Sequence, residues 1–228
     1  MHNNNQFLLS GAPVKILVGE FGSGKTELAL NYALQIKEQG FKTVIVDIDL
    51  VKPYFRTREN RTLLEQNGIE VIAPEVRWEN ADLPILPHHL ARVLGEKDCR
   101  VVMDVGGGES AVVLGQLNRL FASTPYQALL VVNTCRPFTN TVDAVVELHH
   151  RIENVSKLKI TGIISNTNLA AETNEQHIYD GLTIAEAAAE QLAAPVLCVA
   201  VPEWLADKID TRQPILVVKP HIQYPWMG

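Results

Sequence analysis

A complete phosphate-binding loop lies close to the start of the chain, where residues Gly19–Thr26 read G-E-F-G-S-G-K-T. This segment matches the pattern G-x-x-x-x-G-K-[ST] and directly follows the apolar run Val14–Val18, which predicts a strand. The apolar residues between Leu28 and Ile36 have helical spacing. A strand, a glycine loop and a helix in this order direct backbone N–H groups and the positive end of the helix dipole at phosphate oxygens. We therefore expect the chain to bind a nucleotide.

The loop pattern assigns roles to individual residues. Lys25 is expected to reach the β- and γ-phosphates, and Thr26 is expected to ligate Mg²⁺. The other phosphate-binding candidates in this segment are Gly19, Gly22, Ser23, Gly24 and Glu27.

Short β-branched apolar runs alternate with helical segments along the chain. The runs are Val14–Val18, Thr43–Asp47, Ile69–Ala73, Val101–Val105, Ala128–Asn133, Ile160–Ser165 and Val196–Val201. This alternation predicts an α/β fold with a doubly wound, mostly parallel sheet of about seven strands and helices on both faces. In such sheets, ligands bind at the carboxyl ends of the strands.

The length of 228 residues and the hydrophobic content of 46% fit one domain over residues 1–228, with tails expected at 1–12 and 221–228. The proline-interrupted region from Leu50 to Leu94 is expected to form a switch and partner surface, with helices at Thr57–Gln66 and His88–Leu94. The sequence therefore favours one compact nucleotide-binding unit with a variable segment.

Charge and cysteine content exclude several classes of partner. The formal net charge of −6 argues against non-specific binding of nucleic acid. Cys99, Cys135 and Cys198 form no C-x-x-C pair, which favours a reduced setting. The sequence has neither a signal-peptide pattern nor an apolar stretch of about 18 residues. We expect a soluble, cytoplasmic protein with neither a nucleic acid nor a membrane as partner.

Acidic residues end two of the predicted strands. Asp47 and Asp49 are two positions apart, which places both on the same side of an extended segment. Asp104 ends an apolar strand and precedes three glycines. Carboxylates at such positions hold Mg²⁺ through water and orient an attacking water. Lys25, Asp49 and Asp104 are therefore the catalytic candidates, Gly107 is a backbone contact to the γ-phosphate, and Asp47 is the weaker acid, with capping of the strand end as its alternative role.

Taken in order, these motifs resemble the MinD/ParA-type P-loop ATPases, a deviant Walker A class that includes the nitrogenase iron protein and the CobQ/CobB-like enzymes. The segments that carry the resemblance are Gly19–Thr26, Val44–Pro53, Val102–Gly107, Val131–Pro137, Gly162–Asn166 and Val201–Glu203. Agreement is best with a bacterial branch described only as CobQ/CobB/MinD/ParA nucleotide-binding domains. The resemblance covers nearly the whole chain.

The resemblance implies ATP and Mg²⁺ as cofactors and slow ATP hydrolysis that switches the protein toward a protein partner not yet identified. It implies Lys25 on the phosphates, Thr26, Asp49 and Asp104 as Mg²⁺ ligands, partly through water, and Asn166 with the backbone of Pro202 and Glu203 around the base. Binding of ATP would order residues 49–58 and 106–110.

The loop Asn166–Leu169 favours adenine over guanine. Its sequence is N-T-N-L, whereas a GTP-selective N-K-x-D loop has a carboxylate at the position of Leu169. Without that acceptor, the guanine donors would be unsatisfied at a cost of roughly several kcal/mol in a buried site. ATP is therefore the expected nucleotide.

One residue departs from the pattern of the dimeric members, which carry a lysine at the loop position of Glu20. A carboxylate cannot stabilise phosphate charge across a dimer interface, and it repels phosphate unless it is turned outward or bound to a metal. Lys52, Arg56 and Arg58 are other sources of positive charge, although a plain solvated surface is the commoner role of such residues. A nucleotide-dependent homodimer is left open.

Two other enzyme classes compete with the switch. The alternative is an ATP-dependent small-molecule ligase or kinase of the CobQ/CobB or dethiobiotin-synthetase type, in which Arg56, Arg58 and Arg77 would grip an anionic substrate. A bacterial tyrosine kinase shares the acid pair but carries a tyrosine-rich tail, and here that region has only Tyr224.

Two further side-chain groups suggest metal sites but are better explained by packing. Cys135 follows a predicted strand, and one thiol per chain supports at best a two-coordinate site, so loop packing is expected. His149 and His150 are adjacent on a predicted helix and do not share a face, so both are expected at the surface.

Overall fold

The computed structural model describes residues 11–48, 57–73, 85–106, 109–122 and 124–222. The expectations for Asp49, Lys52, Arg56, Arg77, Gly107 and the side chain of Arg58 lie outside the described residues.

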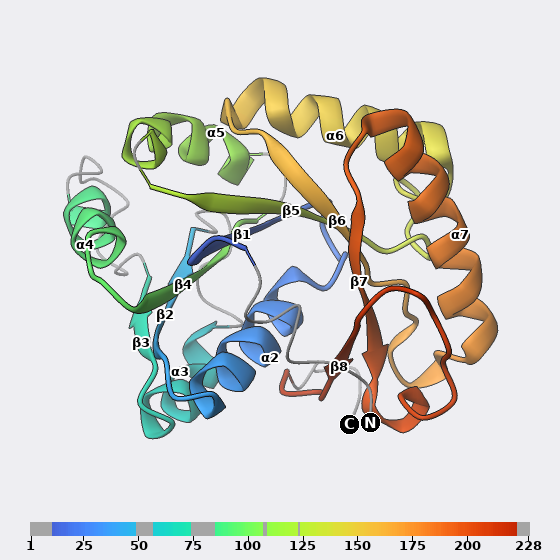
Figure 1. The fold of residues 1–228 in the computed structure, drawn as a ribbon, viewed down its shortest axis with the longest axis horizontal. Coiled ribbons are helices and arrows are strands. Elements are labelled where there is room, and N and C mark those ends of the chain that lie inside the picture. The colour runs from blue at the N-terminus through green and yellow to red at the C-terminus, as the bar shows by residue number, and fades with distance from the viewer. Residues whose placement is uncertain (1–10, 49–56, 74–84, 107–108, 123, 223–228) are drawn as a thin grey trace.

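Eight strands form one sheet in the order β3-β2-β4-β1-β5-β6-β7-β8, and all neighbouring strands pair in parallel (Figure 1). The strands are β1 (Val14–Val18), β2 (Lys42–Asp47), β3 (Glu70–Ile72), β4 (Cys99–Asp104), β5 (Tyr126–Val132), β6 (Ile160–Ser165), β7 (Val196–Pro202) and β8 (Ile215–Val218). The first seven correspond to the apolar runs of the sequence. Strand β8, at the edge beside β7, was not expected.

Helices cover both faces of the sheet. They are α2 (Lys25–Glu38), α3 (Thr57–Gln66), α4 (Ile85–Leu94), α5 (Glu109–Gln116), α6 (Val142–Ser156) and α7 (Glu175–Leu192), with short 3-10 helices η2 (Asn118–Phe121), η3 (Ala170–Glu172) and η4 (Glu203–Leu205). Helices α2 and α3 pack on one face, and α4 to α7 pack on the other (Figure 1). The expected doubly wound α/β architecture is confirmed.

Strand β1 is buried on both faces. Ile16 and Val18 pack with the layer of α4 to α7, whereas Leu17 packs with the layer of α2. β-branched and leucine side chains suit this position, because a central parallel strand has no face in water. The loop that follows β1 therefore leaves the sheet from its middle.

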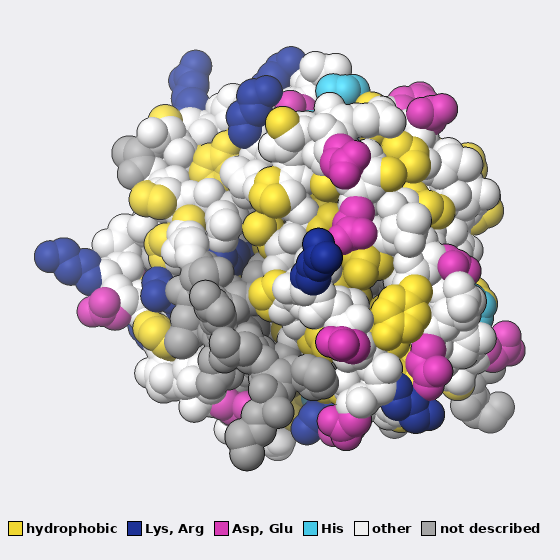
Figure 2. Space-filling view, turned by 45° about the vertical axis from the view of Figure 1, so that its right-hand side comes forward, with side chains coloured by type: hydrophobic (Ala, Val, Ile, Leu, Met, Phe, Trp, Pro, Cys, Tyr) yellow, Lys and Arg dark blue, Asp and Glu magenta, His cyan; other side chains and the backbone are white. Residues whose placement is uncertain are grey.

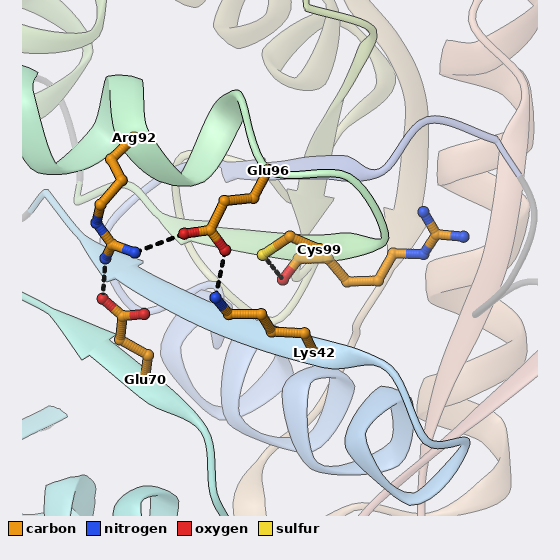
Figure 3. A network of polar contacts seen from close by, with 6 residues as sticks. Lys42, Glu70, Arg92, Glu96 and Cys99 are labelled. Atoms are coloured by element: carbon orange, nitrogen blue, oxygen red, sulfur yellow. Dashed lines mark hydrogen bonds and ion pairs between the residues drawn. The ribbon is translucent and has the colours of Figure 1, made fainter.

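Four charged side chains join α4 to the strands beside it. They are Lys42, Glu70, Arg92 and Glu96 (Figure 3). Arg92 pairs with both glutamates, at 2.6 Å from its Nη1 to Oε1 of Glu96, and Glu96 also pairs with Lys42. Exposed ion pairs of this kind contribute little to stability. Leu90 of the same helix is fully buried in the apolar core, so apolar packing is the main attachment of α4.

Two residues that were expected at the surface are buried. His149 is only 5% exposed, because α6 buries a stripe that includes Val145, Leu148 and Ile152, and His149 lies beside that stripe. Burial lowers the pKa of its imidazole. Ile222, expected in a tail, is also buried and packs with the apolar layer around α2.

Acidic and basic side chains are interspersed over the face shown in Figure 2, with apolar side chains between them. No continuous basic surface covers this face. Among the described helices, none combines the length and the apolar character that a membrane crossing requires.

We predict that Leu90→Ala lowers the free energy of unfolding by about 2 to 5 kcal/mol, because it leaves a cavity beneath α4. Arg92→Ala should cause a much smaller decrease, because its ion pairs are exposed. Urea denaturation of both variants measures the difference. Equal losses would show that the charged network, and not the apolar contact, holds α4.

Candidate functional site

The glycine loop joins β1 to α2 at the carboxyl edge of the sheet. Helix α2 begins at Lys25, and Gly24 at its N-cap has a left-handed backbone with φ 87° and no side-chain cap. A residue with a Cβ adopts this conformation at a cost, which explains the glycine. The loop is thus built as the sequence pattern predicts, with Thr26 and Glu27 in the first helical turn.

The Lys25 side chain folds back over the loop and is buried. Its Nζ donates to the carbonyl oxygens of Gly19 at 3.1 Å and Glu20 at 2.8 Å, and lies 3.4 Å from Oγ of Ser23. Negatively charged oxygens are stronger acceptors for an ammonium group than neutral carbonyls. The lysine is therefore placed where an anion entering the loop would meet it.

Two buried carboxylates lie at the carboxyl ends of neighbouring strands. Asp47 of β2 and Asp104 of β4 are register partners, and Leu17 of β1 is also a register partner of Asp104. Each aspartate lies two positions after a residue that packs with α2, Ile45 or Val102, so both belong to the side of the sheet that carries the loop helix. Asp47, which the sequence ranked below Asp49, therefore joins Asp104 in the candidate set.

The oxygen donors at this edge suit magnesium. Hydroxyl and carboxylate oxygens, here those of Thr26, Asp47 and Asp104, are the ligand type that Mg²⁺ prefers, with water and phosphate completing its shell. Within the described ranges, no group of three or more His, Cys, Asp and Glu residues is arranged for metal binding.

Asn166, expected near the base, contacts the loop itself. Its Nδ2 donates to the carbonyl oxygen of Ser23 at 2.7 Å, and its own carbonyl accepts from Nδ2 of Asn168 at 2.8 Å. A Cβ added to Gly24 would lie 2.4 Å from Asn166 Nδ2. The loop after β6 is thereby fixed against the phosphate-binding loop.

Asn133 is a buried connector that the sequence analysis did not identify. From the end of β5, its Oδ1 accepts from the backbone N–H groups of Cys135 at 3.0 Å and Asn168 at 3.2 Å. Its Nδ2 donates to the Asn168 carbonyl at 3.1 Å. Burial raises the pKa of the Cys135 thiol, and the contact with Asn133 agrees with a packing role for this cysteine. The sequence feature that could have identified Asn133 is an asparagine directly after a buried strand.

Two arginines from the β5–α6 region contact the outer side of the loop. Arg151 of α6 pairs with the carboxylate of Glu20 at 2.5 Å, and Nε of Arg136 donates to the carbonyl of Gly22 at 3.1 Å. The Glu20 carboxylate is therefore directed toward a cation of its own chain. This is the outward orientation that a carboxylate in a phosphate loop requires.

The Glu27 side chain binds backbone groups that lie far along the chain. Its two carboxylate oxygens accept the backbone N–H groups of His221 at 2.7 Å and Ile222 at 3.1 Å. Burial raises the pKa of this carboxyl, and the two N–H donors oppose that shift. Only the backbone of Glu27 is left to face a ligand in the loop. The reason is a tertiary contact with a segment that was expected to be a tail.

The other two residues expected around the base lie at the carboxyl end of β7. Pro202 ends β7 and is buried, and Glu203 begins η4 with its side chain exposed. The Glu203 carboxylate lies 3.5 Å from Nζ of Lys219.

Comparison with known proteins identifies the fold. No family model matches the chain, and no curated protein matches it. Among solved structures, the cell division protein FtsY from Thermotoga maritima has a TM-score of 0.59 at 20% identity, over 82% of this chain and 61% of that one. The signal recognition particle 54 kDa protein from Aeropyrum pernix K1, in complex with GDP, has a TM-score of 0.54 at 20% identity, over 82% of this chain and 41% of that one.

A third structure, FlhF complexed with GTP/Mg²⁺, has a TM-score of 0.54 at 16% identity, over 82% of this chain and 64% of that one. The chain spans about three fifths of the length of the FtsY structures that it matches. At these identities the likeness concerns the fold. The single parallel α/β sheet with helices on both faces is that of a P-loop NTPase.

We predict that Gly24→Ala destabilises the protein more than Gly40→Ala. Both glycines have φ +87°, but a Cβ at Gly40 meets nothing within 4 Å, whereas one at Gly24 meets Asn166. Gly40→Ala should cost about 1 to 2 kcal/mol for the left-handed backbone. Gly24→Ala should cost about 1 to 3 kcal/mol more, because displacement of Asn166 leaves the Ser23 carbonyl unsatisfied.

Chemical denaturation of both variants measures this difference. In an Asn166→Ala background the extra cost at Gly24 should disappear. If the two alanine variants lose the same stability, Asn166 does not hold the loop.

Proposed function

We propose that this chain is a Mg²⁺-dependent ATP-binding protein that hydrolyses ATP slowly and acts as a nucleotide switch toward a protein partner, as in MinD/ParA-type ATPases. The observation that carries the proposal is the glycine loop with Lys25 folded over it, beside the register-paired Asp47 and Asp104. Cradle, cation and carboxylates are the parts that phosphoryl transfer requires, since its catalysis is mostly positioning and electrostatics.

The choice of ATP rests on the loop after β6. Leu169 occupies the position at which a guanine-selective loop has its carboxylate, and its N–H donates to Oγ1 of Thr173 at 2.9 Å. Asn168, its neighbour, is held by Asn133 and Asn166 through hydrogen bonds. Two of the similar structures are described with GDP or GTP/Mg²⁺, so GTP is the competitor to test.

The ion pair between Glu20 and Arg151 supports a site that is complete within one chain. A loop residue already bound to a cation of its own chain is not available to a second nucleotide across an interface. A nucleotide-dependent homodimer, if it forms, would therefore use other residues for the charge that the lysine supplies in dimeric relatives of the resembled family.

Exposed aromatic side chains at the loop edge support a protein partner. Phe21 in the glycine loop and Phe138 in the loop after β5 are 61% and 72% exposed. Arg136 binds Gly22 and so connects these two loops. Aromatic residues are enriched in protein–protein interfaces relative to the rest of the protein surface. The three cysteines are free, which agrees with a cytoplasmic setting.

We predict that Lys25→Ala lowers the affinity for Mg-ATP at least about 100-fold, or about 2.7 kcal/mol, because the charge-assisted contacts to the phosphates are lost. Lys37→Ala, in the last turn of the same helix, is the matched control and should bind as the unmodified protein does. Isothermal titration with Mg-ATP and Mg-GTP, with phosphate release measured in parallel, tests the proposal. An unmodified protein that binds neither nucleotide would refute it, and phosphate release that requires a second small molecule would favour the ligase or kinase alternative.

We predict that Leu169→Asp shifts the preference toward GTP by at least about tenfold relative to ATP, because the new carboxylate accepts from the guanine donors. Leu169→Asn changes the size similarly without supplying the charge and is the control. Competition between the two nucleotides for each variant gives the ratio. A preference that is unchanged by Leu169→Asp would mean that this loop does not read the base.

A further inference from the structure

One face of the loop helix binds an extended segment of the chain. The segment is residues 217–222, here called the strap, and the side chains that bind it are Glu27, Asn31 and Gln35. These three positions are four residues apart, so they lie on one face of α2. Strand β8, whose end begins the strap, lies in contact with α2 (Figure 1).

The spacing of the contacts matches the geometry of a strand beside a helix. Gln35 Nε2 donates to the carbonyl of Val217 at 2.9 Å. Asn31 makes two hydrogen bonds to the backbone of Lys219. Its Nδ2 donates to the Lys219 carbonyl, and its Oδ1 accepts from the Lys219 N–H, each at 2.8 Å. Four helical residues rise about 6 Å and two extended residues about 6.6 Å, so every second strap residue meets the next side chain. The strap runs toward the phosphate-binding end of the helix.

The contact nearest the loop is the strongest. The Glu27 carboxylate accepts two N–H groups, from His221 and Ile222, and charge-assisted hydrogen bonds are about twice as strong as neutral ones. The Ile222 side chain is buried in the same apolar layer as Leu28 and Ile36. The strap is therefore fastened by both polar and apolar contacts next to Thr26.

The helix position of Glu27 offers its carboxylate another partner, the backbone N–H of the N-cap residue Gly24. With Gly24 as N-cap, Glu27 is the third residue of α2. A glutamate at this position commonly reaches back to the N–H of the N-cap residue. In a phosphate-binding loop that N–H is one of the groups directed at the ligand. A carboxylate bound there would compete with a phosphate for the same donor, whereas in the structure the Glu27 oxygens accept from the N–H groups of His221 and Ile222.

We propose that the strap keeps the Glu27 carboxylate away from the Gly24 N–H, so that Glu27 is a positioning residue whose attachment to residues 221 and 222 controls the affinity of the loop for phosphate. This inference rests on the proposed function. The strap also pairs with Glu203 through Lys219, at 3.5 Å, and so contacts the other end of the candidate site. Attachment of the strap and occupancy of the loop are coupled, and by linkage each favours the other.

The test is a set of variants in which a structural role and a positioning role give opposite results. Asn31→Ala removes both bonds to Lys219 and also the contact of Asn31 Nδ2 with Oε1 of Glu27 at 3.3 Å, so it loosens the strap and the Glu27 carboxylate together. We expect it to weaken the binding of Mg-ATP and Mg-GTP alike by about tenfold, equivalent to about 1.4 kcal/mol. Gln35→Ala, at the end of the strap far from the loop, is the matched control and should change affinity little.

The deciding variant is Asn31→Ala combined with Glu27→Ala, measured by titration with both nucleotides. Removal of the competing carboxylate should restore affinity close to that of the unmodified protein, although the strap has lost a further contact. A merely structural role predicts the opposite, a double variant that binds more weakly than either single one, and that result would overturn the proposal. Thermal melting of each variant verifies that it is folded at the temperature of the titration.

Amide hydrogen exchange provides an independent readout on the unmodified chain. Saturation with Mg-ATP should slow exchange at His221 and Ile222 by at least the factor by which Asn31→Ala weakens binding, because coupling is reciprocal and a variant that loosens the strap loses at most the full coupling. Nucleotide binding without slower exchange at these two amides refutes the coupling while leaving the proposed function intact. Absence of any nucleotide binding refutes the proposed function, and this inference with it.

Discussion

Strand β1 is hydrogen-bonded along both edges, to β4 and to β5, and this position determines what surrounds the glycine loop. Because parallel strands end at one edge of the sheet, the loop emerges between the ends of its two neighbours. On one side lie Asp104 and, one strand further, Asp47. On the other side lie Asn133 and the loops that it connects. The chemistry available to the loop follows from this arrangement of strands.

The sheet could be predicted from the sequence because its strands are buried on both faces. The bounds of β1, α3 and β6 agree with the sequence residue for residue, since short β-branched runs and a helix stopped before Gly68 are local signals. Strand β8 was missed because Ile215–Val218 has only four residues and lies between Pro214 and Pro220. The loop could be recognised because its glycines are required by local backbone geometry, which a motif records.

The contacts on the outer side of the loop could not be predicted, because each joins positions far apart in the chain. Glu20 and Arg151 are 131 residues apart, and Glu27 and His221 are 194 residues apart. The motif describes the residues that face a ligand, and Glu27 was grouped with them because it follows Thr26. Its side chain is directed elsewhere, since a helix turns about 100° per residue and neighbours in sequence therefore face different surroundings.

Different chemical groups surround the loop on its two sides. Strands β2 and β4 end in the carboxylates of Asp47 and Asp104, whereas the chain after β5 supplies donors for the carbonyl groups of the loop, including Arg136 for Gly22 and Asn166 for Ser23. A buried carbonyl that is already satisfied holds its peptide group in one orientation. The outer contacts therefore hold these peptide groups of the loop in place before any ligand arrives. Binding that needs no rearrangement of the loop loses less free energy to ordering, so the outer contacts contribute to affinity without touching the ligand.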